Sequence, residues 1–153
     1  MLKDGDKAPN VILPLPDGSS TSVADQAGKI LVLYFYPKDD TPGCTTEAQS
    51  FTALADDFAR TGATIIGVSK DKPARHQKFI DKYGLTIRLA SDSDDSICEA
   101  YGTWIEKTLY GRNYMGIDRA TFLIDKDGMI AKIWRKVKVK GHAEEVLTAA
   151  KLL

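Results

Sequence analysis

Reactive and metal-binding side chains are scarce in this chain. Its 153 residues include only two cysteines, Cys44 and Cys98, and only two histidines, His76 and His142. Two cysteines without a Cys-x-x-Cys spacing exclude a disulfide-dense miniprotein and argue against a disulfide reductase built on such a pair. The histidines lie far apart in the sequence and are expected to be solvated or helix-capping residues, so we expect no metal site.

The chain also lacks an excess of charge of either sign and any long apolar run. It carries 21 basic and 21 acidic residues, which argues against nucleic-acid binding and against a membrane-surface protein. Its longest apolar run, residues 30–36, is far shorter than the roughly 20 residues of a membrane-spanning helix. Residues 1–6 contain no apolar stretch typical of a signal peptide, so we expect a cytoplasmic protein.

What is present is an ordinary globular composition, with 43% hydrophobic residues and strand and helix signals that alternate along the chain. Strands are predicted at residues 11–15, 30–36, 64–68, 87–90, 121–124 and 129–134, and helices at residues 45–60, 73–83, 94–101 and 142–151. The last two strands flank Asp125-Lys126-Asp127-Gly128, a hairpin turn signal. We therefore expect one α/β domain over residues 1–153, with a central mixed β-sheet flanked by helices on both faces.

One loop carries the clearest chemical signal. It follows the buried strand at residues 30–36, and ligands of α/β proteins bind outside the carboxyl ends of strands. Thr41 followed by Pro42 is typical of a helix N-cap with proline at the first helical position. Cys44 then falls in the first turn, where free N–H groups and the helix dipole favour the thiolate over the thiol. The polar, glycine- and proline-rich surroundings predict that Cys44 is reactive and reachable by solvent.

The same loop resembles the active-site motif of the peroxiredoxins. Pro37-x-x-x-Thr41-x-x-Cys44 matches that motif, and Thr41-Pro42-Gly43-Cys44-Thr45-x-Glu47 resembles the peroxiredoxin Q branch, also called bacterioferritin comigratory protein. Further matches, at residues 5–9, 67–71 and 116–125, extend the resemblance over nearly the whole chain. It implies a thioredoxin-like fold, thiol-dependent peroxidase activity as an antioxidant enzyme, and no prosthetic group or other cofactor.

The resemblance also implies roles for individual residues. Cys44 would be the nucleophile that attacks the peroxide, Thr41 would hydrogen-bond the peroxide as one of its donors, and Pro37 would shield the sulfur from water. Arg119 would hold the thiolate and the peroxide oxygens with its guanidinium, whose planar set of donors suits a growing negative charge. Glu47 is expected to support the site, either by capping the helix or by orienting Arg119.

The attack would leave a sulfenic acid on Cys44, which another thiol must reduce. Many relatives carry a resolving cysteine at the position of Gln49 or near that of Ile80, and this chain has neither. Two schemes remain. In the favoured one an external donor such as thioredoxin, glutaredoxin or glutathione reduces Cys44. In the other, Cys98 resolves it after local unfolding, since a disulfide needs Cα atoms within about 7 Å.

Two other functions are alternatives to the peroxidase. A redox-responsive binding protein would use oxidation of Cys44 to alter partner docking, with negligible turnover. The basic run at residues 132–140 alternates with apolar residues and is read as the solvent face of a strand rather than as a nucleic-acid site. Residues 103–115 are expected to form an aromatic loop near the active-site mouth or at a contact surface, in a monomer or weak homodimer.

Overall fold

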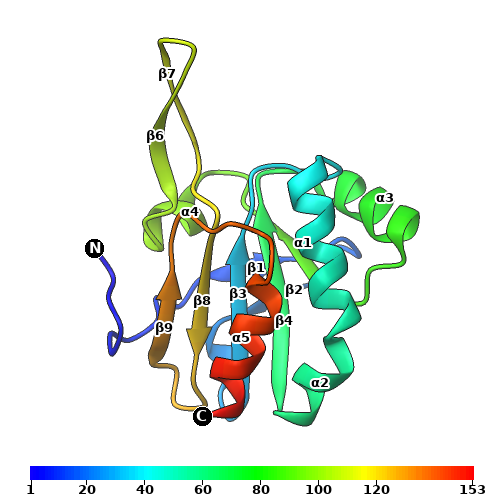
Figure 1. Cartoon of the computed structure of the whole chain (residues 1–153), viewed down its shortest axis with the longest axis vertical. Coiled ribbons are helices and arrows are strands. Elements are labelled where there is room, and N and C mark those ends of the chain that lie inside the picture. The colour runs from blue at the N-terminus through cyan, green and yellow to red at the C-terminus, as the bar shows by residue number, and fades with distance from the viewer.

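The computed structural model describes all residues from Met1 to Leu153, and its centre is a mixed five-stranded sheet with strand order β5-β4-β3-β8-β9 (Figure 1). These strands are β3 (Ile30–Phe35), β4 (Ala63–Ser69), β5 (Arg88–Ser91), β8 (Ala120–Ile124) and β9 (Ile130–Trp134). Strand β3 pairs in parallel with β4, and β4 with β5, whereas β8 runs antiparallel to both β3 and β9. The predicted mixed α/β sheet is confirmed.

Alternate residues of β3 separate two hydrophobic cores. Val32 and Tyr34 face a core completed by helices α1 (Pro42–Ala53), α2 (Ala55–Arg60), α3 (Pro73–Tyr83) and α5 (His142–Lys151). Leu33 and Phe35 face the other core, which is covered by the short helix α4 (Ser96–Ala100) and the N-terminal segment. That segment contains the hairpin of β1 (Ile12–Pro14) and β2 (Ser20–Ser22) and the 3-10 helix η1 (Ala24–Gln26). Because both faces are buried, the central strands read as continuous apolar runs.

The helix predicted over residues 45–60 is two helices. Helix α1 begins at Pro42, and the chain leaves helical geometry at Leu54 before α2 starts. Phe51 and Phe58, on either side of this break, pack together with ring centroids 5.9 Å apart. The apolar spacing correctly predicts the buried face, but it does not show the break at Leu54 that leaves both rings in one core. Helix α4 is also shorter than the predicted 94–101, and Gly102 ends its turn with a positive φ.

The predicted aromatic loop is a β-hairpin, formed by β6 (Trp104–Leu109) and β7 (Arg112–Ile117), that projects away from the body of the molecule (Figure 1). Its two turn residues, Tyr110 and Gly111, both have positive φ, as a type I′ turn requires. The first position of such turns usually holds Asn, Asp or Gly, so the tyrosine at this position gave no sequence signal for a hairpin. The antiparallel pair of β8 and β9 and the helix at residues 142–151 agree with prediction.

The two histidines are buried, contrary to the expectation of solvated residues. His76 on α3 is fully enclosed and His142, the first residue of α5, is 4% exposed. Burial lowers the pKa of His142 to about 4, and its Nε2 lies 2.8 Å from the hydroxyl of Thr121. Both rings therefore link a helix to the central sheet through hydrogen bonds.

No helix of the structure combines the length and apolar character required to cross a bilayer.

Candidate active site

The turn between β3 and α1 places the cysteine in the first turn of a helix, as predicted. Thr41 occupies the N-cap with extended backbone geometry, and Pro42 is the first helical residue. The first intrahelical bond runs from the Thr45 N–H to the Thr41 carbonyl at 2.8 Å. Cys44 therefore lies among the N–H groups that have no partner within the helix, where the helix dipole is positive.

Arg119 and Glu47 meet Cys44 from two other parts of the fold. Arg119 precedes β8, and the pairing of Ala120 with Phe35 brings it beside the end of β3. Its Nη2 lies 3.4 Å from Cys44 Sγ, and its Nη1 donates to Glu47 Oε1 at 2.7 Å. One guanidinium thus contacts the sulfur and a carboxylate through separate nitrogens, which fixes its plane over the first turn of α1.

A glycine makes room for this guanidinium. A Cβ placed on Gly43 would lie 3.2 Å from Arg119 Nη2, closer than most such contacts. The arginine side chain itself is 17% exposed. The glycine directly before Cys44 therefore permits the close approach of the cation to the sulfur.

Cys44 itself is buried, with 2% of its surface exposed, which contradicts the expectation of a solvent-reachable sulfur. The reason is its place on α1: it lies on the side of the helix that packs on the sheet, in the same core as Ala48 and Phe51. The surrounding loop is polar, but the residues that enclose the sulfur include this core and the Arg119 side chain. The sulfur is thus enclosed beside a guanidinium.

The Glu47 carboxylate contacts Arg119 and caps no backbone group, a geometry that favours the expected orienting role over the capping one. The residue is 1% exposed, and the only hydrogen bond of its carboxylate is the one from Arg119 to Oε1, so Oε2 has no partner. Burial raises the pKa of Glu47 to about 7, although the charge of Arg119 and its hydrogen bond oppose the shift. Burial lowers the pKa of Arg119, but Glu47 and Cys44 outweigh it and leave the pKa above its ordinary value.

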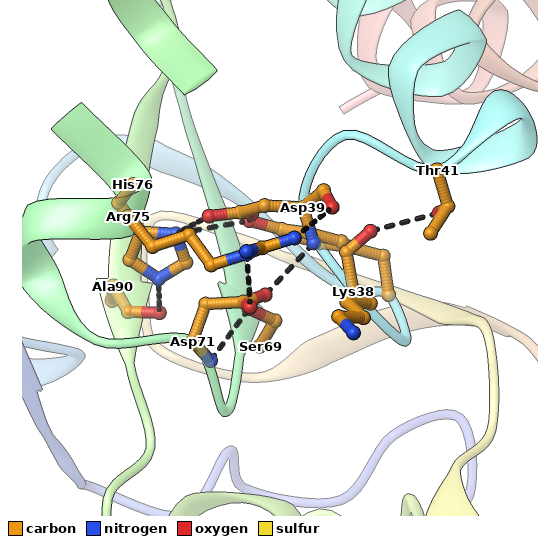
Figure 2. Close-up of polar contacts among 9 residues, drawn as sticks. Lys38, Asp39, Thr41, Ser69, Asp71, Arg75, His76 and Ala90 are labelled. Carbon is orange, nitrogen blue, oxygen red and sulfur yellow. Dashed lines mark hydrogen bonds and ion pairs between the residues drawn. The ribbon is translucent and has the colours of Figure 1, made fainter. Parts of the chain in front are cut away.

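The hydroxyl of Thr41 is already committed as a donor. It donates to the Lys38 carbonyl at 2.8 Å and makes no capping bond to α1 (Figure 2). The predicted donation from Thr41 to the peroxide stays a prediction; in this geometry the proton is directed at the Lys38 carbonyl, and the lone pairs of the Thr41 oxygen are free to accept. Pro37 is exposed and directly follows the last buried aromatic residue after β3, Tyr36.

Cys98 lies in a different environment from Cys44. It is fully buried in α4 and belongs to the core on the opposite face of the central sheet. Its backbone N–H donates to Asp92 Oδ2 at 2.9 Å. Burial, followed by the hydrogen bond with Asp92, raises the pKa of the Cys98 thiol to about 12. A thiol with such a pKa is a poor nucleophile at neutral pH.

Sequence reasoning missed a polar cluster next to this site. Asp39, Asp71 and His76 offer ligand-type atoms within 4.8 Å of one another. Each of these groups has partners in the protein: Asp39 Oδ2 lies 2.6 Å from His76 Nδ1, and Asp71 pairs with Arg75 at 3.1 Å. We therefore describe the cluster as a hydrogen-bond network and not as a metal site. Polar residues after two neighbouring parallel strands, β3 and β4, were the signal that could have predicted it.

Comparison with known proteins gives consistent matches. The AhpC/TSA family model matches residues 5–133. Peroxiredoxin Bcp of Bacillus subtilis is 48% identical over 150 residues, which make up 98% of this chain and 96% of that protein. A cysteine-to-serine mutant of Xylella fastidiosa PrxQ superposes with a TM-score of 0.94 at 42% identity, covering 99% of this chain and 97% of that one. The bacterioferritin comigratory protein of Xanthomonas campestris, solved in work on its alkyl peroxide reduction activity, gives a TM-score of 0.89 at 46% identity, with 93% and 90% covered.

Proposed function

This chain belongs to the AhpC/TSA family and is a peroxiredoxin of the Bcp type, a thiol-dependent peroxidase, and we propose that it reduces hydrogen peroxide and small organic hydroperoxides at Cys44. The observation that carries the proposal is the contact of Arg119 Nη2 with Cys44 Sγ at 3.4 Å, with Glu47 on the other terminal nitrogen. A fixed cation beside the sulfur provides a site at which negative charge that develops in the reaction is stabilised.

In the proposed reaction the Cys44 thiolate attacks the terminal oxygen of the hydroperoxide. An S–O bond forms, the O–O bond breaks, and the sulfur is oxidised to a sulfenic acid. The leaving oxygen departs as hydroxide or alkoxide and takes a proton to give water or an alcohol. Arg119 stabilises the charge that grows on this oxygen through N–H donors already fixed by Glu47.

Thr41 acts at the other end of the bound hydroperoxide. Because its hydroxyl proton points to the Lys38 carbonyl, its oxygen accepts a hydrogen bond from the O–H of the substrate. The substrate is then held between one acceptor and the donors of Arg119, an arrangement that suits a hydroperoxide better than a molecule with no O–H. Pro37, in the preceding turn, is assigned to limiting water at the sulfur.

Reduction of the sulfenic acid is assigned to an external thiol such as thioredoxin, glutaredoxin or glutathione. The arrangement of the two cysteines supports this scheme, because Cys44 and Cys98 belong to cores on opposite faces of the sheet. Bridging them would require both to leave those cores. We further propose that residues 1–153 work as one domain, as a monomer or weak homodimer in the cytoplasm.

A steady-state peroxidase assay with a panel of thiol donors tests the proposal. The wild-type chain should consume hydroperoxide continuously with at least one donor. Cys44→Ser should abolish consumption, while Cys98→Ser, the matched control, should retain it. Turnover by Cys44→Ser would reject the assignment of the nucleophile, and absence of sustained turnover by the wild type with every donor would favour a redox-responsive binding protein.

A further inference from the structure

A network of buried polar groups lies beneath the turn that carries Thr41, and the proposed reaction does not use it (Figure 2). Its centre is Asp39, which has no exposed surface. Asp39 Oδ1 accepts from the Tyr36 hydroxyl at 2.5 Å, and Asp39 Oδ2 lies 2.6 Å from His76 Nδ1. The turn after β3 is therefore tied to α3 by a fully enclosed contact.

The ring of His76 shows how this contact is protonated. Its Nε2 lies 3.0 Å from the Ala90 carbonyl, and a carbonyl can only accept, so Nε2 carries a proton. Nδ1 and Asp39 Oδ2 would repel each other without a second proton between them. The pair as a whole is then neutral, which lowers the desolvation cost of burying it completely. It also holds the Asp39 side chain in one orientation.

The backbone on both sides of Asp39 is held by α3 and by the loop after β4. The Asp39 N–H donates to Asp71 Oδ2 at 2.8 Å, and the Asp39 carbonyl accepts from Arg75 Nη2 at 3.3 Å. Asp71 Oδ2 also accepts from the Ser69 hydroxyl at 2.7 Å, and Arg75 Nε lies 3.1 Å from Asp71 Oδ1. Asp71 is thus fixed by two neighbours and in turn fixes the Asp39 N–H.

The same peptide group connects Asp71 to Thr41. Asp39 N–H and Lys38 C=O belong to one planar unit, so restraining its N–H end also sets the direction of its carbonyl. That carbonyl accepts the Thr41 hydroxyl proton at 2.8 Å. A hydroxyl can otherwise rotate, and its proton would then compete for the position where a substrate O–H must point.

We propose that Asp71 is a positioning residue for the peroxide step. By holding the Lys38–Asp39 peptide, it keeps the Thr41 proton on the Lys38 carbonyl and leaves the Thr41 oxygen free to accept from the hydroperoxide. The Asp39–His76 pair holds the next backbone segment against α3 and prevents the peptide from turning over. This inference rests on the proposed function, since it concerns how a hydroperoxide binds beside Cys44.

Two reactions of the reduced protein separate positioning of the peroxide from general damage. One is oxidation of Cys44 by a hydroperoxide, followed by stopped flow, and the other is its alkylation by iodoacetamide, which needs no acceptor at Thr41. Asp71→Ala should lower the ratio of the first rate constant to the second by about 10- to 100-fold, the scale of a displaced binding group. Asp71→Asn keeps an acceptor oxygen and should restore most of the ratio.

Further variants identify Thr41 as the group through which Asp71 acts. In a Thr41→Val background, Asp71→Ala should cause no further fall in the ratio. Arg75→Met removes the ion pair that holds Asp71 and the contact with the Asp39 carbonyl of the next peptide, and it does so at a side chain that is 50% exposed. It should lower the ratio in the same direction. Asp40→Asn, which disturbs an exposed contact of the same turn with Lys82, is the matched control and should leave the ratio unchanged.

The outcomes are distinct. Equal loss of both rate constants in Asp71→Ala, an unchanged ratio in both Asp71→Ala and Arg75→Met, or a full additional loss in the Thr41→Val background would each overturn the positioning role. If reduced wild-type protein fails to react with any hydroperoxide, the proposed function itself fails, and that result is visible before any variant is compared.

Discussion

At Arg119 a single side chain serves two partners, and the geometry explains why an arginine stands there. Its two terminal nitrogens reach Cys44 Sγ and Glu47 Oε1 at 3.4 and 2.7 Å. A lysine ammonium is a point charge and could not hold both contacts in one plane. Burial of Glu47 is unfavourable, because its Oε2 has no hydrogen-bond partner. The site therefore contains an incompletely satisfied buried carboxyl group, and this group holds the guanidinium beside the sulfur.

The burial of Glu47 predicts a stability change with pH. Its pKa is about 7 in the folded chain against 4.5 for the exposed group, so between these values the unfolded chain releases a proton that the folded chain retains. The free energy of unfolding contributed by Glu47 is thus fully present below pH 4.5 and is lost as pH rises through 7. The loss amounts to roughly 3 kcal/mol. Glu47→Gln keeps an acceptor for Arg119 and should remove this dependence.

Urea denaturation of both proteins across this pH range measures the effect. His142 acts in the opposite direction, because its pKa is lowered to about 4 and its contribution to stability is lost as pH falls from 6.5. The informative quantity is therefore the difference between wild type and Glu47→Gln, in which the His142 contribution cancels. The free energy of unfolding of the wild type should fall relative to that of Glu47→Gln as pH rises. Parallel curves would disprove a raised pKa at Glu47.

At the scale of elements, the contact between β3 and β4 depends on a glycine opposite an aromatic residue. Tyr34 of β3 is paired with Gly67 of β4, and its ring lies over that glycine. A Cβ on Gly67 would lie 2.7 Å from Tyr34 Cζ, far inside normal contact. The ring is stacked on Phe51 of α1 with centroids 4.8 Å apart and is 1% exposed, so it is packed on its other side as well. Gly67 thus lets the sheet and α1 pack closely beneath the active-site turn.

Gly67→Ala should destabilise the chain by about 1–3 kcal/mol, the usual cost of overpacking a core. The measurement is the free energy of unfolding in denaturant for the variant and the wild type. In a Tyr34→Leu background the same substitution should cost clearly less, because the ring that it meets is gone. An equal cost in both backgrounds would show that the ring is not the cause.

The elements themselves were largely predictable where a local signal marks them. Pro73 at the start of α3, and Gly84 with its left-handed geometry at the end, have the residue types that helix ends require. The β6–β7 hairpin was not predicted, because tyrosine occupies a turn position where asparagine or glycine is usual. The break at Leu54 was missed because apolar spacing reports which face is buried and not the direction of the axis.

The site was predictable to the extent that it is local. Thr41, Pro42 and Cys44 lie within four residues of one helix start, so their geometry follows from helix-start rules. Arg119 lies 75 residues from Cys44 and was assigned only through the family resemblance, since their contact depends on β8 pairing with β3. The Asp39–Asp71–His76 network was also not predicted, because its other members lie 32 and 37 residues from Asp39 and meet only in the folded chain. The burial of Cys44 was missed because the polar loop sequence does not show which side of α1 faces the sheet.

At the scale of the whole molecule, the central sheet separates the two thiols. Cys44 lies in the core beneath α1, α3 and α5, and Cys98 lies in the core beneath α4 and the N-terminal segment. One sulfur adjoins a guanidinium, whereas the other has a thiol pKa raised to about 12 by burial and Asp92. The two cysteines therefore differ in environment, which supports the proposals that Cys44 is the reactive sulfur and that a separate thiol reduces it.

The most direct measurement is to treat the reduced chain with one equivalent of hydroperoxide, trap sulfenic acid with dimedone, and locate the label by mass spectrometry without reducing agent. We predict the label on Cys44, none on Cys98, and no bridge between the two residues in the monomer. A Cys44–Cys98 bridge would contradict reduction by an external thiol, and peroxide consumed with Cys44 unmodified would contradict the account of this sulfur as the nucleophile.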